Sequence, residues 1–105
     1  MAQTQSTACA EIVSFRLIDG ADPAAFLDAA AATRAVLEAF GGCRARYLTR
    51  GDDGTWTDIV IWTDRATALA AAQHVVKDPA FAPFGAMIDG PSVTMGHADI
   101  LWQMG

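Results

Sequence analysis

The stretch from Thr55 to Asp64 carries the clearest hydrophobic pattern in the chain. It is rich in β-branched and aromatic residues. Its alternate positions form two sets, which are Trp56, Asp58, Val60 and Trp62, and Thr57, Ile59, Ile61 and Thr63. Successive residues of a strand point to opposite faces, and both sets are largely apolar. The pattern therefore predicts a central strand covered on both sides, most simply by helices on one face and by a partner subunit on the other.

A second strand is expected just before it, at 43–50, and the turn Gly51-Asp52-Asp53-Gly54 would join the two strands into a β-hairpin. The register that this turn implies pairs Arg50 with Thr55, Tyr47 with Asp58, Ala45 with Val60 and Cys43 with Trp62. Arg44 and Arg46 would then lie on the opposite face. A slip of one residue would reverse these faces.

The remaining elements follow from helix caps and turn residues. Asp22 and Asp64 are suited to cap helices, Gly41-Gly42 is suited to end the first helix, and Pro83 should kink a short helical segment. The expected order is a strand at 8–17, a helix at 23–40, strands at 43–50 and 55–64, a helix at 65–77, a short helical segment at 80–88 and a strand at 92–103. This order predicts an α+β fold, the ferredoxin-like split βαβ plan with a four-stranded antiparallel sheet.

The expected core positions of the second helix are Ala68, Leu69, Ala72, Val75 and Val76. In the last strand, His97 and Asp99 share one face with Met95.

Length and composition are consistent with one domain. The chain has 105 residues, and its hydrophobic content of 52% with only 18% charged residues suggests that part of the apolar surface is covered by another chain. Residues 1–7 are polar and uncharged, so we expect a disordered N-terminal tail followed by a single domain over 8–105. Because neither a signal peptide nor a membrane-spanning run is evident, we expect a soluble, cytoplasmic protein without a membrane partner.

Charge and cysteine usage exclude several classes of partner. The net charge is -5, which argues against nucleic acid, since binding to a phosphate backbone depends on clustered Lys and Arg. Cys9 and Cys43 lie in no C-x-x-C motif and beside no suitably spaced His, so neither a zinc site nor a disulfide framework is expected. Neither cysteine has a setting that suggests a reactive thiol.

A set of residues spread along the chain resembles a known family. These are Phe15, Gly42, Asp53-Gly54-x-Trp56, the strand from Asp58 to Trp62, Asp78-Pro79-x-Phe81-x-x-Phe84 and Ser92-Val93-Thr94-Met95-x-His97. Between about Ala10 and Leu101 the chain looks like the dimeric α/β-barrel superfamily of antibiotic biosynthesis monooxygenase-like proteins. The resemblance implies a homodimer in which two four-stranded sheets form one barrel, with a pocket in each subunit between its sheet and its helices.

Members of that superfamily include cofactor-independent oxygenases of aromatic polyketides and quinol-like compounds, haem-degrading enzymes and stress-linked proteins. The haem-degrading branch relies on an Asn, Trp and His set, whereas this chain contains no Asn and His74 falls opposite the apolar stripe of its helix. The resemblance therefore implies chemistry without a cofactor or a metal.

Few polar residues could support that chemistry, which requires a base and donors that stabilise an oxyanion. Trp62 and Tyr47 could wall the pocket and orient an aromatic ligand, with Asp58 as a base or an orienting group. The alternatives are a core aromatic for Trp62 and a structural hydrogen bond between Tyr47 and Asp58. The best candidate for a general base is His97, with Asp99 fixing its tautomer, although a partly buried His satisfied by a neighbour is the simpler interpretation.

Two further groups have both a functional and a structural interpretation. Phe81 and Phe84, with Met87, could form a lid over the pocket or a small core beneath the insertion. The arginines at 44, 46 and 50 could hold an anionic substrate or pair with carboxylates at an edge.

The sequence therefore favours two hypotheses. The first is a homodimeric, cofactor-independent monooxygenase-like protein, with His97 and Asp58 as catalytic residues and Trp62, Tyr47, Phe81 and Phe84 around a small hydrophobic or aromatic molecule. The second is a non-catalytic dimeric barrel that binds a small ligand or takes part in a stress response.

Overall fold

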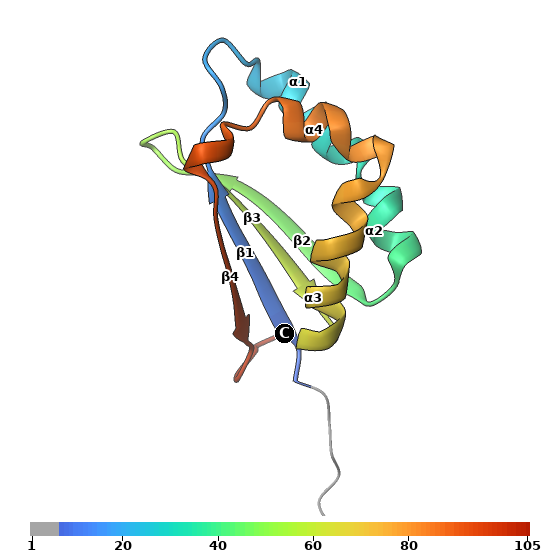
Figure 1. The fold of residues 1–105 in the computed structure, drawn as a ribbon. Helices are drawn as coiled ribbons and strands as arrows, with labels where there is room; N and C mark the ends of the chain where they lie inside the picture. The colour runs from blue at the N-terminus through green and yellow to red at the C-terminus, as the bar shows by residue number, and fades with distance from the viewer. Residues whose placement is uncertain (1–6) are drawn as a thin grey trace, which may run out of the picture.

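The computed structural model describes residues 7–105, in which one antiparallel sheet carries all the helices on one face (Figure 1). The strands are β1 (Cys9–Phe15), β2 (Cys43–Arg50), β3 (Trp56–Trp62) and β4 (Thr94–Asp99). The helices are α1 (Pro23–Ala32), α2 (Arg34–Phe40), α3 (Arg65–His74) and α4 (Ala82–Ala86), with short 3-10 turns at Val75–Lys77, Pro79–Phe81 and Gly90–Ser92. Residues 1–6 of the expected tail lie outside the described part of the chain.

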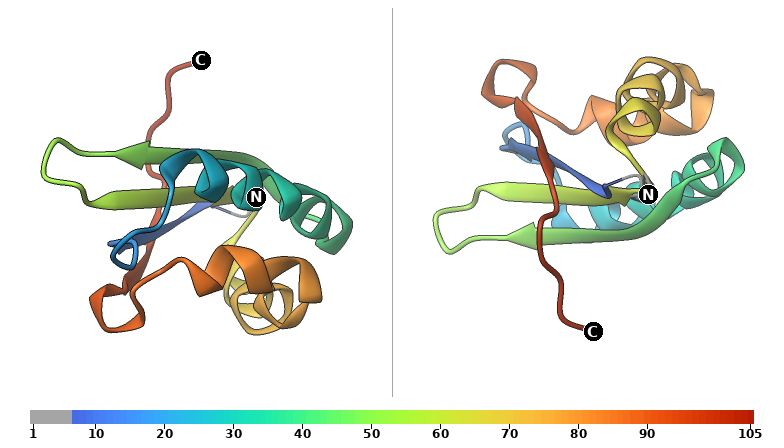
Figure 2. Two further views of the ribbon diagram at one scale, coloured as in Figure 1. Left: turned by 90° about the horizontal axis from the view of Figure 1, so that it is seen from above. Right: turned by 90° about the horizontal axis from the view of Figure 1, so that it is seen from below.

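The strand order in the sheet is β2-β3-β1-β4, and every neighbouring pair is antiparallel. Strand, helix, strand, strand, helix and strand follow one another as the ferredoxin-like plan requires, with α4 inserted before β4. The predicted fold class is thereby confirmed at the level of one chain. In the two views of Figure 2, α3 and α4 lie together to one side of the strands.

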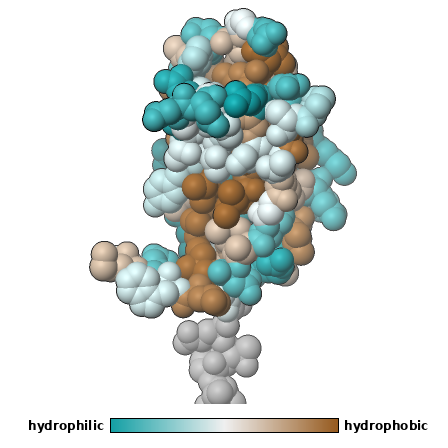
Figure 3. Space-filling view, turned by 90° about the vertical axis from the view of Figure 1, so that its left-hand side faces the viewer, coloured by the Kyte–Doolittle hydropathy of each residue, from teal (hydrophilic) through white to brown (hydrophobic). Residues whose placement is uncertain are grey.

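Alternation along β3 shows which face meets the helices. Trp56, Asp58, Val60 and Trp62 are all buried, whereas the residues between them are only partly buried. The buried set therefore faces the helices. The open face carries Ile12 and Tyr47, which are 40% and 58% exposed, beside the partly buried Ile59 and Ile61. Figure 3 views the side of the molecule away from the helices, where hydrophobic residues gather in a central band.

The predicted register of the hairpin is wrong by one residue over most of its length. The turn closes on a hydrogen bond of 2.8 Å from the Gly51 amide to the Thr55 carbonyl, so Arg50 pairs with Trp56, and Tyr47 pairs with Ile59. An irregularity between Cys43 and Ala45 then restores the predicted pairing of Cys43 with Trp62. The sequence pattern does not predict this bulge. Because of it, the residues from Ala45 to Arg50 lie on the opposite face from the predicted one.

This correction exchanges the places of two predicted side chains. Arg46 lies on the helix-facing side beside Asp58, instead of with Ile59 and Ile61. Tyr47 lies on the open face instead.

The helix expected at 23–40 is interrupted at Thr33, which separates α1 from α2. The Thr33 side chain is fully buried, and its hydroxyl donates a hydrogen bond of 2.6 Å to the carbonyl of Ala30. Such back-bonding of a Thr to the preceding turn competes with regular helix geometry and bends helices.

The expected caps are present. The Asp22 side chain accepts from the Ala24 amide, and the Asp64 side chain accepts from the Thr67 amide at 2.7 Å. The hydrogen bonds from Thr67 lower the pKa of the Asp64 carboxyl. Pro83 lies in the first turn of the short α4, as expected of a segment broken by proline.

The core of α3 differs in detail from the predicted stripe. Ala68 and Val75 are buried as expected, but Ala71 is buried as well, whereas Leu69 and Val76 are about half exposed. β4 is also shorter than the predicted strand, because its ladder ends at Asp99. Beyond it, Leu101, Trp102 and Met104 are 79–89% exposed. Within the described residues, none of the helices has the length and apolarity needed to cross a bilayer.

Candidate functional site

A cavity of about 240 Å³ lies between the helix-facing side of the sheet and the helices. Its walls are mostly apolar and come from every strand, from Leu37 of α2, and from the segment that carries Phe81 and Phe84. Three ionisable side chains line it, and they are Glu11, Arg46 and Asp58. An apolar cavity with a few converging polar groups is the usual form of a small-molecule site.

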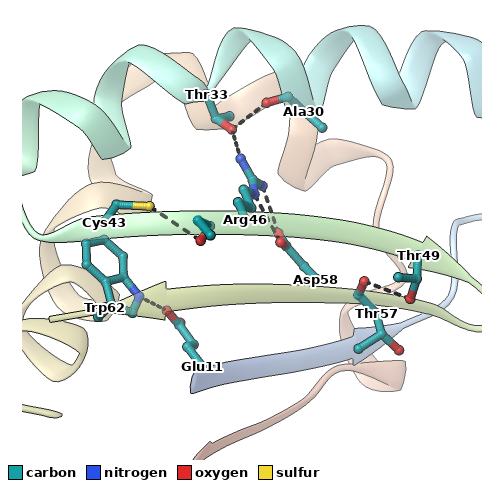
Figure 4. A network of polar contacts seen from close by, with 10 residues as sticks. Glu11, Ala30, Thr33, Cys43, Arg46, Thr49, Thr57, Asp58 and Trp62 are labelled. Atoms are coloured by element: carbon teal, nitrogen blue, oxygen red, sulfur yellow. Dashed lines mark hydrogen bonds and ion pairs between the residues drawn. The ribbon is translucent and has the colours of Figure 1, made fainter. Parts of the chain in front are cut away.

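Arg46 and Asp58 form a bidentate ion pair in the wall of this cavity. The Arg46 Nε and Nη2 atoms donate to the two carboxylate oxygens of Asp58 at 3.0 and 2.7 Å, and Nη1 donates to the Thr33 hydroxyl at 2.7 Å. The side chains are 17% and 10% exposed. Figure 4 shows Arg46 rising from β2 toward the junction of α1 and α2, with Asp58 beside it. The Thr33 hydroxyl at the helix bend is thus the third hydrogen-bond acceptor that holds the guanidinium in place.

The ring of Phe84 completes the surroundings of Arg46. The guanidinium carbon lies 5.4 Å from the centroid of that ring, which places a cation over an aromatic face. Phe84 is itself buried and stacks on Phe26, with ring centroids 4.9 Å apart. Phe81 lies edge-on to Phe84. Both of these predicted substrate-binding residues line the cavity, and Phe84 also belongs to the packed core.

Glu11 and Trp62 form the second polar contact of the cavity. The Trp62 Nε1 atom donates to Glu11 Oε1 at 2.9 Å, and the two residues are 1% and 8% exposed. Trp62 also packs edge-on against Phe40. Trp62 is therefore both a core aromatic and part of the cavity wall, a position compatible with either interpretation.

His97 lies next to this contact, on β4, as the register partner of Glu11. It is not among the residues that line the cavity. Its Nε2 atom is buried and has no hydrogen-bond partner within residues 7–105. The expected partnership with Asp99 is not seen, because the Asp99 carboxylate lies 3.6 Å from Arg65 in an exposed ion pair.

Tyr47 lies outside the cavity. It is on the open face of the sheet and 58% exposed, so the register shift removes it from the wall that we expected it to form. Arg50 lies over the ring of Trp56 at 5.3 Å from its centroid, and Arg44 is exposed. Of the three arginines, only Arg46 reaches the cavity.

The structure also bears on metals and thiols. The described residues contain no group of three or more His, Cys, Asp or Glu side chains arranged to hold a metal ion. Burial raises the pKa of the Cys43 thiol, which disfavours the reactive thiolate. Both cysteines are free thiols.

Sequence analysis missed two residues of the site, Glu11 and Thr33. Glu11 shares the helix-facing side of β1 with Val13 and Phe15, and a charged residue on a core face is a signal that the alternation pattern contained. Thr33 carried no such signal, because a Thr in an alanine-rich helix is unremarkable until its buried partner is known.

No protein-family model and no curated protein matches the chain. Solved structures do match. A proposed antibiotic biosynthesis monooxygenase from Bordetella bronchiseptica superposes with a TM-score of 0.71 at 19% identity, covering 92% of this chain and all of its own. SnoaB, a cofactor-independent oxygenase from Streptomyces nogalater, superposes with a TM-score of 0.60 at 20% identity, covering 95% of this chain and 97% of its own.

A protein of unknown function from Nitrosomonas europaea matches equally well, with a TM-score of 0.71 at 18% identity and 96% of both chains covered. These similarities confirm the predicted resemblance at the level of fold. Because the identities are low and one neighbour has no known function, the reaction must be argued from the site itself.

Proposed function

We propose that this chain, which has the fold of antibiotic biosynthesis monooxygenase-like proteins, oxidises a small aromatic or enolisable molecule with O2 and without a cofactor. The observation that carries the proposal is the buried Arg46–Asp58 pair in the wall of an otherwise apolar cavity. When Asp58 takes a proton from the substrate, the substrate oxyanion that forms can pair with Arg46 in its place. The net charge of the site then does not change.

The proposed reaction begins at a C–H bond next to a carbonyl or hydroxyl-bearing ring. Asp58 takes the proton, the electron pair stays on the substrate as an enolate, and the enolate oxygen pairs with Arg46. Arg46 uses three of its five N–H groups on Asp58 and Thr33, so two remain for a ligand. The enolate then replaces the neutralised carboxylate as the partner of the guanidinium.

Oxygen supplies the oxidising power. The enolate transfers one electron to O2, the two radicals combine into a C–O bond, and the resulting peroxide takes the proton back from Asp58. Loss of water from the hydroperoxide leaves a carbonyl group. Overall, one methylene group and one O2 give one carbonyl group and one water, so no further reductant is required.

His97 remains a second proposed base. Its Nε2 atom is buried and has no hydrogen-bond partner within residues 7–105, and its register partner Glu11 lines the cavity, but His97 itself does not, so it would have to move to reach a substrate. If His97 is the base, His97→Ala removes turnover and Asp58→Asn does not. If Asp58 is the base, Asp58→Asn removes turnover and His97→Ala does not.

An oxygen electrode with a panel of one-ring quinols and other one-ring enolisable aromatics tests the enzyme hypothesis. We expect oxygen uptake with at least one of them in the presence of a chelator. The alternative function, a non-catalytic ligand-binding protein, is supported by the mostly apolar wall and by the packed position of Phe84. Binding of panel members without any oxygen uptake would establish that alternative.

We also propose that the protein is a homodimer that uses the open face of its sheet. Ile12 and Tyr47 are exposed there, next to Ile59 and Ile61, and the apolar side chains of Leu101, Trp102 and Met104 lie unpacked beyond β4. Large contiguous apolar surfaces of this kind mark protein interfaces. The cytoplasmic location remains a prediction.

A further inference from the structure

Glu11 has an environment that is unusual for a carboxylate. It is 8% exposed, and its only hydrogen bond within residues 7–105 joins Oε1 to the indole nitrogen of Trp62. None of the ion pairs in that part of the chain includes it. Buried carboxylates are normally paired with a cation, because removing a charge from water without a partner is costly.

The other ionisable groups of the cavity leave this charge uncompensated. Arg46 and Asp58 neutralise one another through their bidentate contact. His97 is the register partner of Glu11, but the two side chains form no ion pair. With Arg46 and Asp58 paired, Glu11 is the one ionisable group of the lining set whose charge is unmatched.

We propose that Glu11 makes the cavity select aromatic ligands that carry a protonated amine. The ammonium group would donate to the free oxygen of Glu11, and the ring would lie against Trp62, Phe81 and Phe84. Aromatic faces add to the attraction, since their quadrupoles favour a nearby cation. This inference rests on the proposed function insofar as it assigns a ligand class to the same cavity.

Size and charge narrow the class further. A cavity of about 150 Å³ already holds benzene, so 240 Å³ has room for one ring with a short side chain. A carboxylate on that side chain would face the negative charge of Glu11 in a poorly solvated site. Aromatic acids should therefore bind worst.

Calorimetric titration with four one-ring probes tests the selectivity: 2-phenylethylamine, 2-phenylethanol, ethylbenzene and 3-phenylpropanoate. We expect the amine to bind about tenfold more tightly than the alcohol, because hydrogen bonds to charged groups are worth more than neutral ones. The acid should not bind measurably. Equal affinities for the amine and the acid would overturn the proposal.

Variants assign the effect to one side chain. Glu11→Gln keeps the shape of the side chain and a hydrogen-bond acceptor. The variant should therefore bind the alcohol with unchanged affinity but lose most of its preference for the amine. Glu38, the other glutamate of the chain, lies on the exposed face of α2 and pairs with Arg34. Glu38→Gln changes the net charge equally and should leave the preference intact. An amine preference that survives Glu11→Gln, or that disappears in Glu38→Gln, contradicts the assignment.

The same probes separate this inference from the proposed reaction. Selective amine binding without oxygen uptake by any substrate would remove the oxygenase function and leave the Glu11 site. Oxygen uptake with no preference among the four probes would support the oxygenase function and remove the Glu11 site. Should Glu11→Gln fail to fold, the probe series on the unaltered protein still decides the charge selectivity.

Discussion

At the scale of the residue, the site depends on one ion pair that sequence analysis placed on opposite faces of the sheet. The sequence marks both Arg46 and Asp58 as candidate functional residues, but the register that it predicts places them on opposite faces. The pairing became visible only with the irregularity between Cys43 and Ala45. The candidate residues were therefore predictable from the sequence, but the ion pair between them was not. A shift of one residue in register moves every side chain of a strand to the other face.

Arg46→Met tests whether the buried pair also stabilises the fold. The change leaves the Asp58 carboxylate buried without a cation, so the free energy of unfolding should fall by about 3–5 kcal/mol in urea denaturation. Arg34→Met breaks an exposed pair with Glu38 and should cost about 0.5 kcal/mol or less. The double variant Arg46→Met with Asp58→Leu should recover much of the loss. Equal losses for the two single variants would contradict this account.

At the scale of the element, caps and turns were predicted well and helix continuity was not. Asp22, Asp64 and Pro83 act where local sequence rules place them, because a cap needs only its own first turn. At Thr33 the helix breaks where the buried hydroxyl donates to the Ala30 carbonyl and also accepts from Arg46 of β2, and local sequence rules do not predict this second contact, thirteen residues away. The helix bend and the site are thus one feature.

The cap of α3 gives a pH-dependent prediction at this scale. The pKa of Asp64 is lowered in the folded protein by hydrogen bonds from Thr67, so its contribution is present above its unfolded pKa and is lost as pH falls through the folded value. Asp64→Ala should therefore lower the melting temperature at pH 7 and have a smaller effect near pH 2.5. Asp28→Ala, on an exposed position of α1, serves as the control. An effect that grows toward low pH would contradict the linkage.

At the scale of the whole molecule, the two-sided apolar pattern of β3 was the best guide to the fold. One side of that pattern is now explained by the helices, which bury Trp56, Val60 and Trp62. The other side exposes Ile12 and Tyr47, which the proposed homodimer would cover. The sequence therefore predicted the architecture of the chain and left the assembly to be tested.

Light scattering at micromolar concentration tests the dimer directly. We expect a mass twice the 11.1 kDa of one chain. Ile12→Asp places a charge on the open face, where the residue is 40% exposed, and should yield monomers. Leu69→Asp places the same charge at a comparably exposed position of α3 and should leave the dimer intact. A monomer for the unaltered chain would remove this proposal and with it the explanation of the exposed apolar face.

The central claim is that Asp58, held by Arg46, takes a proton from a substrate in the cavity and that O2 then reacts with the resulting enolate. Oxygen uptake with the best substrate of the panel, at saturation and with a chelator present, tests it most directly when Asp58→Asn is compared with Asp28→Asn. The account predicts a loss of about 100-fold or more for Asp58→Asn, as expected when a general base is removed, and no change for Asp28→Asn. Undiminished oxygen uptake by a folded Asp58→Asn protein would contradict it.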